Sequence, residues 1–297
     1  MEELKILYFH QHFSTPAGKT GTRSYEMAKA ALKKGHEVLM VCGSYDASST
    51  GLKEEFKKGS RRGWVDGIEV LEFRMPYSND QSLIARTLIF LKFSFSATMI
   101  ALTEKYDLIF CTSTPLTIAL PGIFSKWIRN KPFVFEVRDL WPELPKAMGV
   151  ITNPFVIGLM SGLEFVAYRS SDACIALAPG IADGIKRRRK KKEVHLVPNG
   201  CDLNLFDSSI VKGWRPKELV GKDFIAIFTG AHGIANGLDA VLDAAHELKR
   251  RKRMDITFVF VGQGKMKPSL KARTTEKGLI NCIFLDPLPK EKLARLM

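Results

Sequence analysis

Short apolar runs alternate with segments of helical periodicity through residues 1–200. Apolar runs bounded by turn residues are typical of buried strands, and apolar residues every three or four positions are typical of helices. We expect strands at Lys5–His10, His36–Cys42, Asp107–Thr112, Pro132–Val137, Ala173–Leu177 and Glu193–Val197, and helices at Arg23–Lys34, Ser82–Lys105, Pro115–Ile128, Pro154–Arg169 and Gly180–Arg189. Asp66-Gly67, between strand-like flanks, predicts a hairpin. The alternation predicts an α/β fold, a doubly wound parallel sheet with helices on both faces.

A second series of the same kind follows an irregular polar stretch. Its expected strands are Asp223–Thr229, Asp255–Val261 and Asn281–Leu285, and its helices are Leu238–Arg251, Lys267–Lys277 and Pro289–Met297. We therefore predict two Rossmann-like domains, residues 1–200 and 223–297, joined by a linker at 201–222. Three strands leave a sheet edge exposed and make about half of a usual domain. The second domain is thus expected to be incomplete, either truncated or completed by another chain.

Composition and charge narrow the class of protein. The chain has 297 residues, of which 45% are hydrophobic and 26% charged, as in soluble globular proteins. Its five cysteines stand apart with no Cys-x-x-Cys pair, which favours a reduced, cytoplasmic protein with neither a zinc site nor disulfides. A strand follows directly on Met1–Glu3, so we expect no secretory leader. The net charge of +14 favours anionic partners.

An anionic membrane surface is one such partner. The expected helix Ser82–Lys105 is apolar but carries Arg86 and Lys92, and the run Lys186–Lys192 is wholly basic. Basic residues on an apolar helix favour peripheral docking on the inner face of the cell membrane. The alternatives are a core helix of the first domain and a solvated loop. Nucleic acid is not expected, because no aromatic stacking motif accompanies the basic run.

Arg138-Asp139-Leu140-Trp141-Pro142-Glu143 follows directly on an expected buried strand. In open α/β sheets, ligands bind outside the carboxyl ends of the strands. A guanidinium, two carboxylates and an indole at such an end suit a polar, hydroxyl-bearing ligand. The alternative is a local Arg–Asp pair, with Trp141 filling a gap between helix and sheet.

Glycine-bearing loops occupy equivalent places in the two series. Gly18 and Gly21 precede the first helix, Gly230, Gly233 and Gly237 precede the first helix of the second series, and Gly262 and Gly264 follow its next strand. Helix N-terminal amides favour an anion, so the loop with His232 and Asn236 suits a diphosphate, and Gly262–Gly264 a ribose or base. No loop has the GxGxxG pattern of dinucleotide binding. Tight turns without a ligand are the alternative.

Several motifs in this order resemble retaining glycosyltransferases of family 4. They span essentially the whole chain: Arg138–Glu143, Ser171–Gly180, Val197–Phe206, Phe228–Leu238 and Val261–Gly264. The Asp-Leu-Trp-Pro-Glu and Ala-Asn-Gly-Leu-Asp versions are similar to the branch that builds O-antigen, capsule and exopolysaccharide, including the fucosamine-type transferases.

The resemblance implies a GT-B fold of two Rossmann-like domains, the second incomplete here. It implies a nucleotide-sugar donor, usually UDP-linked, held mainly by the second domain, and a glycan or polyprenyl-diphosphate-linked acceptor on the first. Neither a cofactor nor a metal is implied. The implied catalytic residues are Arg138, Asp139 and Glu143. Thr22, Arg23 and Trp141 would face the acceptor, and the donor would meet Gly18, Gly21, Gly230, His232, Gly233, Asn236, Gly237, Gly262 and Gly264.

The chain departs from the family pattern at three points. Ala231 and Asn236 stand where many members carry an Arg and a Lys, and Arg138-Asp139 stands for a His-Asp pair. The Glu-x7-Glu segment that grips the donor sugar and ribose lies beyond the end of the sequence. Impaired activity is therefore expected. Two other functions stay open: a non-catalytic or split-transferase subunit that docks acceptor or membrane, and a basic surface-binding module.

Overall fold

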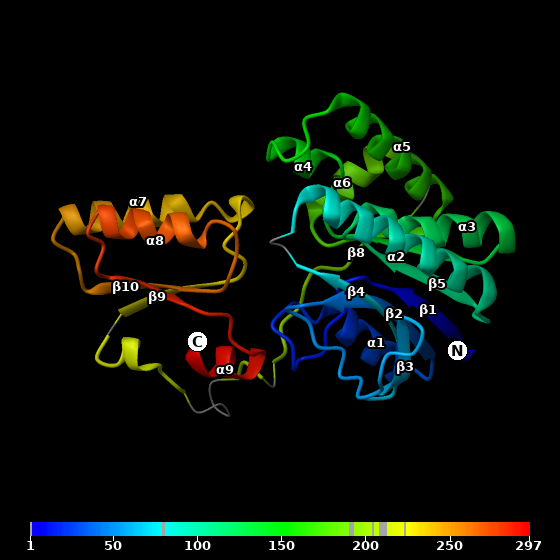
Figure 1. The fold of residues 1–297 in the computed structure, drawn as a ribbon, viewed down its shortest axis with the longest axis horizontal. Helices are drawn as coiled ribbons and strands as arrows, with labels where there is room; N and C mark the ends of the chain where they lie inside the picture. The colour runs from blue at the N-terminus through cyan, green and yellow to red at the C-terminus, as the bar shows by residue number, and fades with distance from the viewer. Residues whose placement is uncertain (1, 79–80, 190–192, 204, 208–212, 223) are drawn as a thin grey trace. The chain divides into compact units, whose positions relative to one another are not determined.

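The computed structural model describes residues 2–78, 81–189, 193–203, 205–207, 213–222 and 224–297. The chain divides into two compact units, Met1–Gly200 and Cys201–Met297. Both consist of parallel strands and helices (Figure 1), which confirms the predicted α/β class.

The described part of unit 1 contains one eight-stranded sheet in the order β3-β4-β2-β1-β5-β6-β7-β8. The strands are β1 Lys5–Phe9, β2 Glu37–Tyr45, β3 Ser60–Val65, β4 Ile68–Tyr77, β5 Leu108–Thr112, β6 Phe133–Val137, β7 Ala173–Ala176 and β8 Val194–Leu196. Neighbours are parallel except β3 and β4, the predicted hairpin. Its turn, Asp66-Gly67, has positive φ at both residues, which the hairpin turn requires. The order runs outward in both directions from β1 and β5, so their carboxyl ends form the switch point where ligands bind in such sheets.

Alternating side chains divide the core of unit 1 into two layers. Leu7 and Phe9 of β1 face one layer of buried residues, and Tyr8 faces the other. Helix α1 (Arg23–Lys33) covers the Tyr8 face, and α2 (Leu83–Thr103), α3 (Ala119–Arg129), α5 (Pro154–Ser170) and α6 (Pro179–Arg188) pack on the other. The predicted helix from Pro115 opens with a separate 3-10 turn, η1 (Leu116–Ile118), and the short helix α4 (Glu143–Ala147) is not predicted.

Helix α2 is apolar around its whole circumference but buried along one stripe only. Phe93, Ala97 and Ala101 pack into the sheet, with Ser94 beside them. By length and composition α2 would suffice to cross a membrane, with a mean hydropathy of 1.5 over a window of which 17% is buried. Here it lies on the core of unit 1, so the expectation of a core helix holds for the buried stripe alone.

Unit 2 has a three-stranded parallel sheet over its described residues, in the order β11-β10-β9. Its strands are β9 Phe224–Thr229, β10 Ile256–Val261 and β11 Cys282–Leu285, and its helices are η3 Ile234–Asn236, α7 Leu238–Arg250, α8 Lys267–Glu276 and α9 Lys290–Leu296. Helices α7 and α8 cover one face, and α9 covers the other together with Leu219 of the 3-10 turn η2 (Lys217–Leu219). Leu219, within the predicted linker, is thus part of the core of unit 2. Asp223 and residues 208–212 lie outside the described residues.

Two helical glycines offer a matched test of the packing in unit 1. A Cβ on Gly122 of α3 would lie 2.2 Å from the fully buried ring of Phe133, whereas a Cβ on Gly158 of α5 would meet nothing within 4 Å. Gly122→Ala should therefore lower the free energy of unfolding by about 1–3 kcal/mol through overpacking. Gly158→Ala should raise it by about 0.5–1 kcal/mol through lower chain entropy. Urea unfolding measures both, and equal effects would contradict the packing described.

Candidate functional site

The carboxyl ends of β1 and β6 bring a buried histidine and an arginine into contact. Nη1 of Arg138 lies 3.3 Å from Nε2 of His10, whose Nδ1 lies 2.7 Å from Oγ of Ser24. Because a guanidinium only donates, Nε2 accepts this bond and Nδ1 carries the hydrogen. Burial, together with the Arg138 cation and the nearby His12, holds the pKa of His10 well below its usual range. His10 is therefore neutral and fixes the direction of the Arg138 side chain.

The loop after β5 positions both Arg138 and Asp139. The Arg138 backbone N–H donates to Oγ of Ser113 over 3.0 Å, and Oγ1 of Thr114 donates to Oδ2 of Asp139 over 3.3 Å. Both side chains are half-buried. The guanidinium and the carboxylate of the predicted motif thus stand at the switch point, held from β1 and β5 and still accessible to a ligand.

Arg23, predicted to face the acceptor, is engaged within the protein. Its Nε and Nη2 donate to Oε1 of the fully buried Glu136 over 3.0 and 2.8 Å, and Nη2 also donates to the Val197 carbonyl. Nη1 donates to the carbonyl of Pro198 and to Oδ1 of Asn199. All five N–H groups of the guanidinium have partners, so in this structure none is left for an acceptor.

Unpartnered polar atoms gather beside this edge. The side-chain amide of Gln11 is 1% exposed, and neither its nitrogen nor its oxygen has a hydrogen-bond partner among the described residues. The same holds for Nδ1 of His12, Nε of Arg86 and Nε1 of Trp141. Buried polar groups in native proteins are normally satisfied, so such a cluster calls for a ligand or water. None of Gln11, His12 and Arg86 is predicted by the sequence, although Gln11-His12 follows β1 as Arg138 follows β6.

Aromatic rings surround His12 and link it to α2. The ring centroid of His12 lies 4.6 Å from that of Tyr77 and 5.2 Å from that of Tyr45. Cζ of Arg86, on α2, lies 5.5 Å from the Tyr77 centroid. Burial, with the cations of Arg138 and Arg86, lowers the pKa of His12 to about 4. Contacts therefore run without a break from Arg138 through His10 and His12 to α2.

The remaining residues of the predicted motif turn toward the surface and the core. Trp141 is half-buried and packs against the core of unit 1, as the alternative interpretation of this residue expects. Glu143 begins α4 and pairs with Arg188 of α6, which also binds the buried Glu164. The structure thus pairs Glu143 with Arg188 rather than with Arg138.

The first glycine loop has one glycine that packing requires and one that it does not. A Cβ on Gly18 would lie 2.1 Å from Oγ of Ser14 and 2.8 Å from the backbone N of Ser49. A Cβ on Gly21 would meet nothing within 4 Å, and the buried Thr22 leads from it into α1. Gly18 therefore serves the packing of the loop, and the approach to the N-terminus of α1 is open at Gly21.

The two glycine turns of unit 2 pack against each other at the carboxyl ends of β9 and β10. A Cβ on Gly262 would lie 1.9 Å from the carbonyl oxygen of Gly230, and one on Gly264 would lie 2.5 Å from that of His232. The backbone N–H of His232 donates to the Gln263 carbonyl over 3.0 Å. These glycines bring the two predicted donor loops together at one edge of the sheet.

The side chain of His232 corrects one expectation. It is 0% exposed, with its ring centroid 6.2 Å from that of Phe228, 6.4 Å from Phe260 and 5.9 Å from Phe284. Burial and the nearby Lys267 cation lower its pKa, which keeps the ring neutral. In this structure the imidazole is therefore part of an aromatic core and is not presented to a diphosphate, because one phenylalanine from each of the three strands surrounds it.

The open part of the second loop lies just before α7. Nδ2 of Asn236 donates to the Ala231 carbonyl over 2.6 Å and closes the turn. A Cβ on Gly233 or Gly237 would meet nothing within 4 Å. The exposed backbone around these glycines therefore leaves room for an anion at the N-terminus of the 13-residue helix α7.

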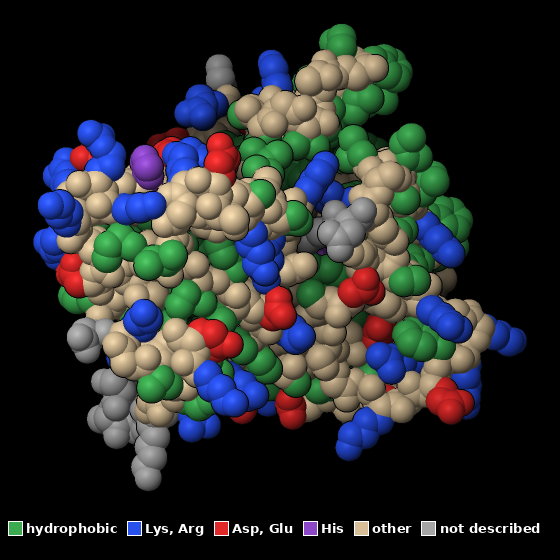
Figure 2. Space-filling model, turned by 60° about the vertical axis from the view of Figure 1, so that its left-hand side comes forward, with side chains coloured by type: hydrophobic (Ala, Val, Ile, Leu, Met, Phe, Trp, Pro, Cys, Tyr) green, Lys and Arg blue, Asp and Glu red, His purple; other side chains and the backbone are tan. Residues whose placement is uncertain are grey.

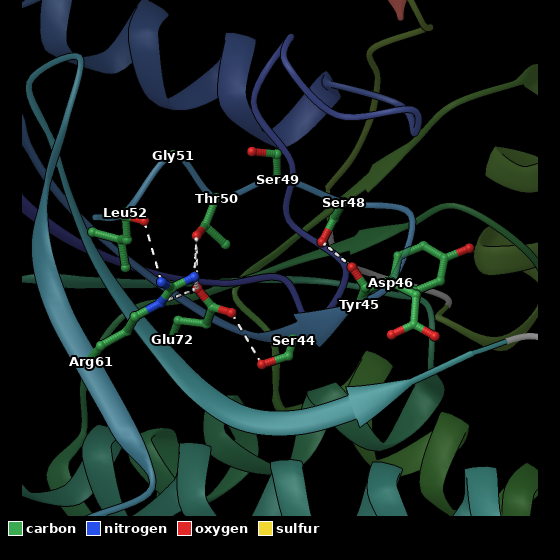
Figure 3. A pocket seen from close by; sticks show the side chains of 10 residues that line it. All are labelled: Ser44, Tyr45, Asp46, Ser48, Ser49, Thr50, Gly51, Leu52, Arg61 and Glu72. Carbon is green, nitrogen blue, oxygen red and sulfur yellow. Dashed lines mark hydrogen bonds and ion pairs between the residues drawn. The ribbon is translucent and has the colours of Figure 1, made fainter. Parts of the chain in front are cut away.

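A separate pocket of about 430 Å³ lies in unit 1, lined by residues 44–46 and 48–52 with Arg61 and Glu72 (Figure 3). Its size suits a small molecule. Its central groups satisfy one another, however: Nη2 of Arg61 and Oγ1 of Thr50 both donate to Oε2 of Glu72 over 2.7 Å, and Oγ of Ser44 donates to Oε1. This network fastens the 44–52 loop to the hairpin and gives less reason for a ligand than the unpartnered groups near Gln11.

Two family profiles match the chain. Residues 20–205 match Glycosyltransferase Family 4, and residues 212–297 match Glycosyl transferases group 1. The first match covers more than half of the sequence. The chain belongs to glycosyltransferase family 4.

Individual relatives of this family 4 chain are distant. O-antigen chain mannosyltransferase C of Escherichia coli is 30% identical over 125 residues, which are 41% of this chain and 31% of that protein. The match thus spans about a third of the length of this curated relative.

Solved structures show that the fold is GT-B. Anabaena HepE in complex with UDP and glucose has a TM-score of 0.62 at 17% identity, over 98% of this chain and 71% of that chain. A putative UDP-N-acetylglucosamine 2-epimerase from Listeria monocytogenes has a TM-score of 0.57 at 12% identity, over 99% of this chain and 72% of that chain. At these identities the likeness establishes the fold alone, and it agrees with the fold expected from the sequence.

The depressed pKa of His12 makes the stability of this family 4 chain depend on pH. The unfolded state takes up a proton near pH 6.5, whereas the folded state does so only near pH 4. Stability from this group is therefore complete above pH 6.5 and is lost as the pH falls toward 4. His12→Phe keeps a ring against Tyr77 and should flatten the fall in unfolding free energy between pH 6.5 and 4, measured by urea unfolding. Identical slopes in both proteins would contradict it.

Proposed function

We propose that this chain takes part in transfer of a sugar from a UDP-linked donor to a glycan or polyprenyl-diphosphate-linked acceptor in cell-surface polysaccharide synthesis. The name of the Escherichia coli relative refers to the O-antigen chain, and HepE was solved with UDP and glucose. We place the reaction in the cytoplasm, on the inner face of the cell membrane. The proposed reaction uses neither a metal nor a cofactor.

One observation carries the acceptor side of this proposal. Arg138 and Asp139 stand at the switch point of unit 1, beside the unpartnered side-chain atoms of Gln11, His12 and Arg86. A sugar offers many hydroxyl groups, each both donor and acceptor, and a diphosphate offers anionic oxygens. Such an acceptor would satisfy the amide of Gln11 and the cations together, where an apolar ligand would leave them unpaired.

The donor diphosphate is assigned to the loop before α7. The backbone at Gly233 and Gly237 is open, and the helix N-terminus favours negative charge. Gly262–Gly264, packed on the same loop, stands ready for the ribose or base. Its contribution is backbone hydrogen bonding, which stabilises charge as the diphosphate leaves.

We assign a front-side displacement with retention to the reaction. The acceptor hydroxyl oxygen bonds to the anomeric carbon as the bond from that carbon to the diphosphate oxygen breaks on the same face, and the leaving phosphate takes the hydroxyl proton. His10 is a poor candidate for the base, because its Nε2 lone pair already accepts from Arg138. Arg138 and Asp139 instead orient the acceptor, and this positioning lowers the barrier.

The donor assignment is tested by thermal unfolding of the full chain with UDP, UDP-sugars, GDP-sugars and ADP-sugars. A ligand at 100 times its Kd adds about 2.7 kcal/mol to the stability, so UDP compounds should raise the midpoint and the others should not. No shift with any nucleotide would overturn the proposal. A shift without transfer to any acceptor would favour the split-transferase subunit.

Two arginines of the same edge separate catalysis from folding. Arg138→Ala and Asp139→Asn should each lower transfer by about a hundredfold or more, with little change in unfolding free energy, because both side chains are half-buried and oriented for a ligand. Arg23→Ala should instead lower the unfolding free energy by about 3–5 kcal/mol, because it leaves Glu136 buried without its cation. Transfer assays paired with urea unfolding measure both. Equal losses of activity and stability in the Arg138 variant would return it to a structural role.

A further inference from the structure

Large apolar side chains are exposed together on three neighbouring helices of unit 1. Helices α2 and α3 contact each other, as do α3 and α5, so the three form one layer over the sheet. They carry more than half of the exposed large apolar side chains in the described part of the chain, some of them visible at the upper right of Figure 2: Leu83, Ile84, Leu88, Leu91, Phe95 and Met99 on α2, Phe124, Trp127 and Ile128 on α3, and Phe155, Val156, Leu159 and Phe165 on α5. We call this set the apolar face. A contiguous patch of this kind marks an interaction surface.

The exposed residues of α2 form a stripe opposite its buried one. Ile84, Leu88, Leu91, Phe95 and Met99 recur every three or four positions, which sets them on one side of the helix. Ile84 is 75% exposed and Phe95 is 70% exposed. The helix thus has one apolar stripe for the sheet and another for a partner outside unit 1.

The charges on the same helices are one-sided. They carry Arg86 and Lys92 on α2, Lys126 and Arg129 on α3, and Arg169 on α5. Their one carboxylate, Glu164, is 1% exposed and pairs with Arg188. Lys126 pairs with Asp172, which lies beyond the end of α5. An apolar surface flanked by cations, without an exposed carboxylate on its own helices, is complementary to an anionic lipid headgroup layer over acyl chains.

The basic run expected to assist docking is used differently. Arg188 binds Glu143 and Glu164, and the buried Arg189 donates to the carbonyls of Tyr168, Ser171 and Asp172. Lys190–Lys192 lie outside the described residues. The attraction to anions near this face therefore rests on the cations of the three helices.

We propose that the apolar face docks unit 1 onto an anionic phospholipid membrane, with α2, α3 and α5 lying on the surface and their exposed side chains entering the boundary between headgroups and acyl chains. This surface stands independently of the transferase activity. It also has a consequence for the candidate site. Arg86, on α2, contacts the aromatic cluster around His12, so the docked helix is part of the wall of that cluster.

Vesicle binding of the full chain tests the proposal. The chain should sediment with vesicles of phosphatidylcholine mixed with phosphatidylglycerol, more weakly at high salt, and little with phosphatidylcholine alone. Replacing Ile84, Leu88 and Phe95 together by Gln should weaken binding at least about tenfold. A matched control replaces Leu203, Phe224 and Ile280 of unit 2, which are equally exposed, and should bind as the unmodified chain does. Circular dichroism and the thermal midpoint check that both variants fold.

Two tryptophans of similar exposure locate the contact. Trp127 of α3 is 62% exposed and Trp64 of β3 is 68% exposed. Brominated phospholipid should quench the fluorescence of the chain and of Trp64→Phe, and Trp127→Phe should lose most of this quenching. Quenching lost in Trp64→Phe instead would overturn the proposal. So would equal vesicle binding by the triple Gln variant, or no vesicle binding together with a dimer, seen by light scattering, that the triple Gln variant abolishes.

Discussion

A buried ion pair between Arg23 and Glu136 holds the edge of unit 1 on which the candidate site depends. Arg23 begins α1, Glu136 ends β6 but for one residue, and the remaining donors of Arg23 reach the segment after β8. One side chain thus joins three stretches far apart in the sequence. Arg138 lies two residues beyond Glu136, so the position of the site's cation depends on this pair. Because both charges are buried, the pair is intolerant of losing either partner.

The elements could be predicted because the signals that fix them are local. Apolar runs such as Phe133–Val137 are bounded by turn residues, and Asp66-Gly67 has the one residue pairing that suits the hairpin turn it forms. Alternation of strands and helices then gives the parallel sheet. The short helix α4 escaped prediction because Pro142 and Pro145 interrupt any helical pattern in that stretch.

The contacts of the site could not be predicted in the same way. Arg23 and Glu136 are separated by 113 positions, and nothing near Arg23 distinguishes a structural arginine from one facing a ligand. A histidine among glycines suggests an anion site, yet Phe228, Phe260 and Phe284 enclose His232 from three strands. Gln11 and His12 carry a signal that is clear only in retrospect: polar residues at the end of a central strand, as at Arg138.

The packing of Gly262 and Gly264 against Gly230 and His232 limits how this part of unit 2 can diversify. A side chain at either glycine would force the two turns apart, since its first carbon would enter a carbonyl oxygen of the facing loop. Between them only Gln263 is exposed. Related chains that keep this fit can therefore alter the chemistry of the turn through a single side chain, while its backbone stays common to all of them.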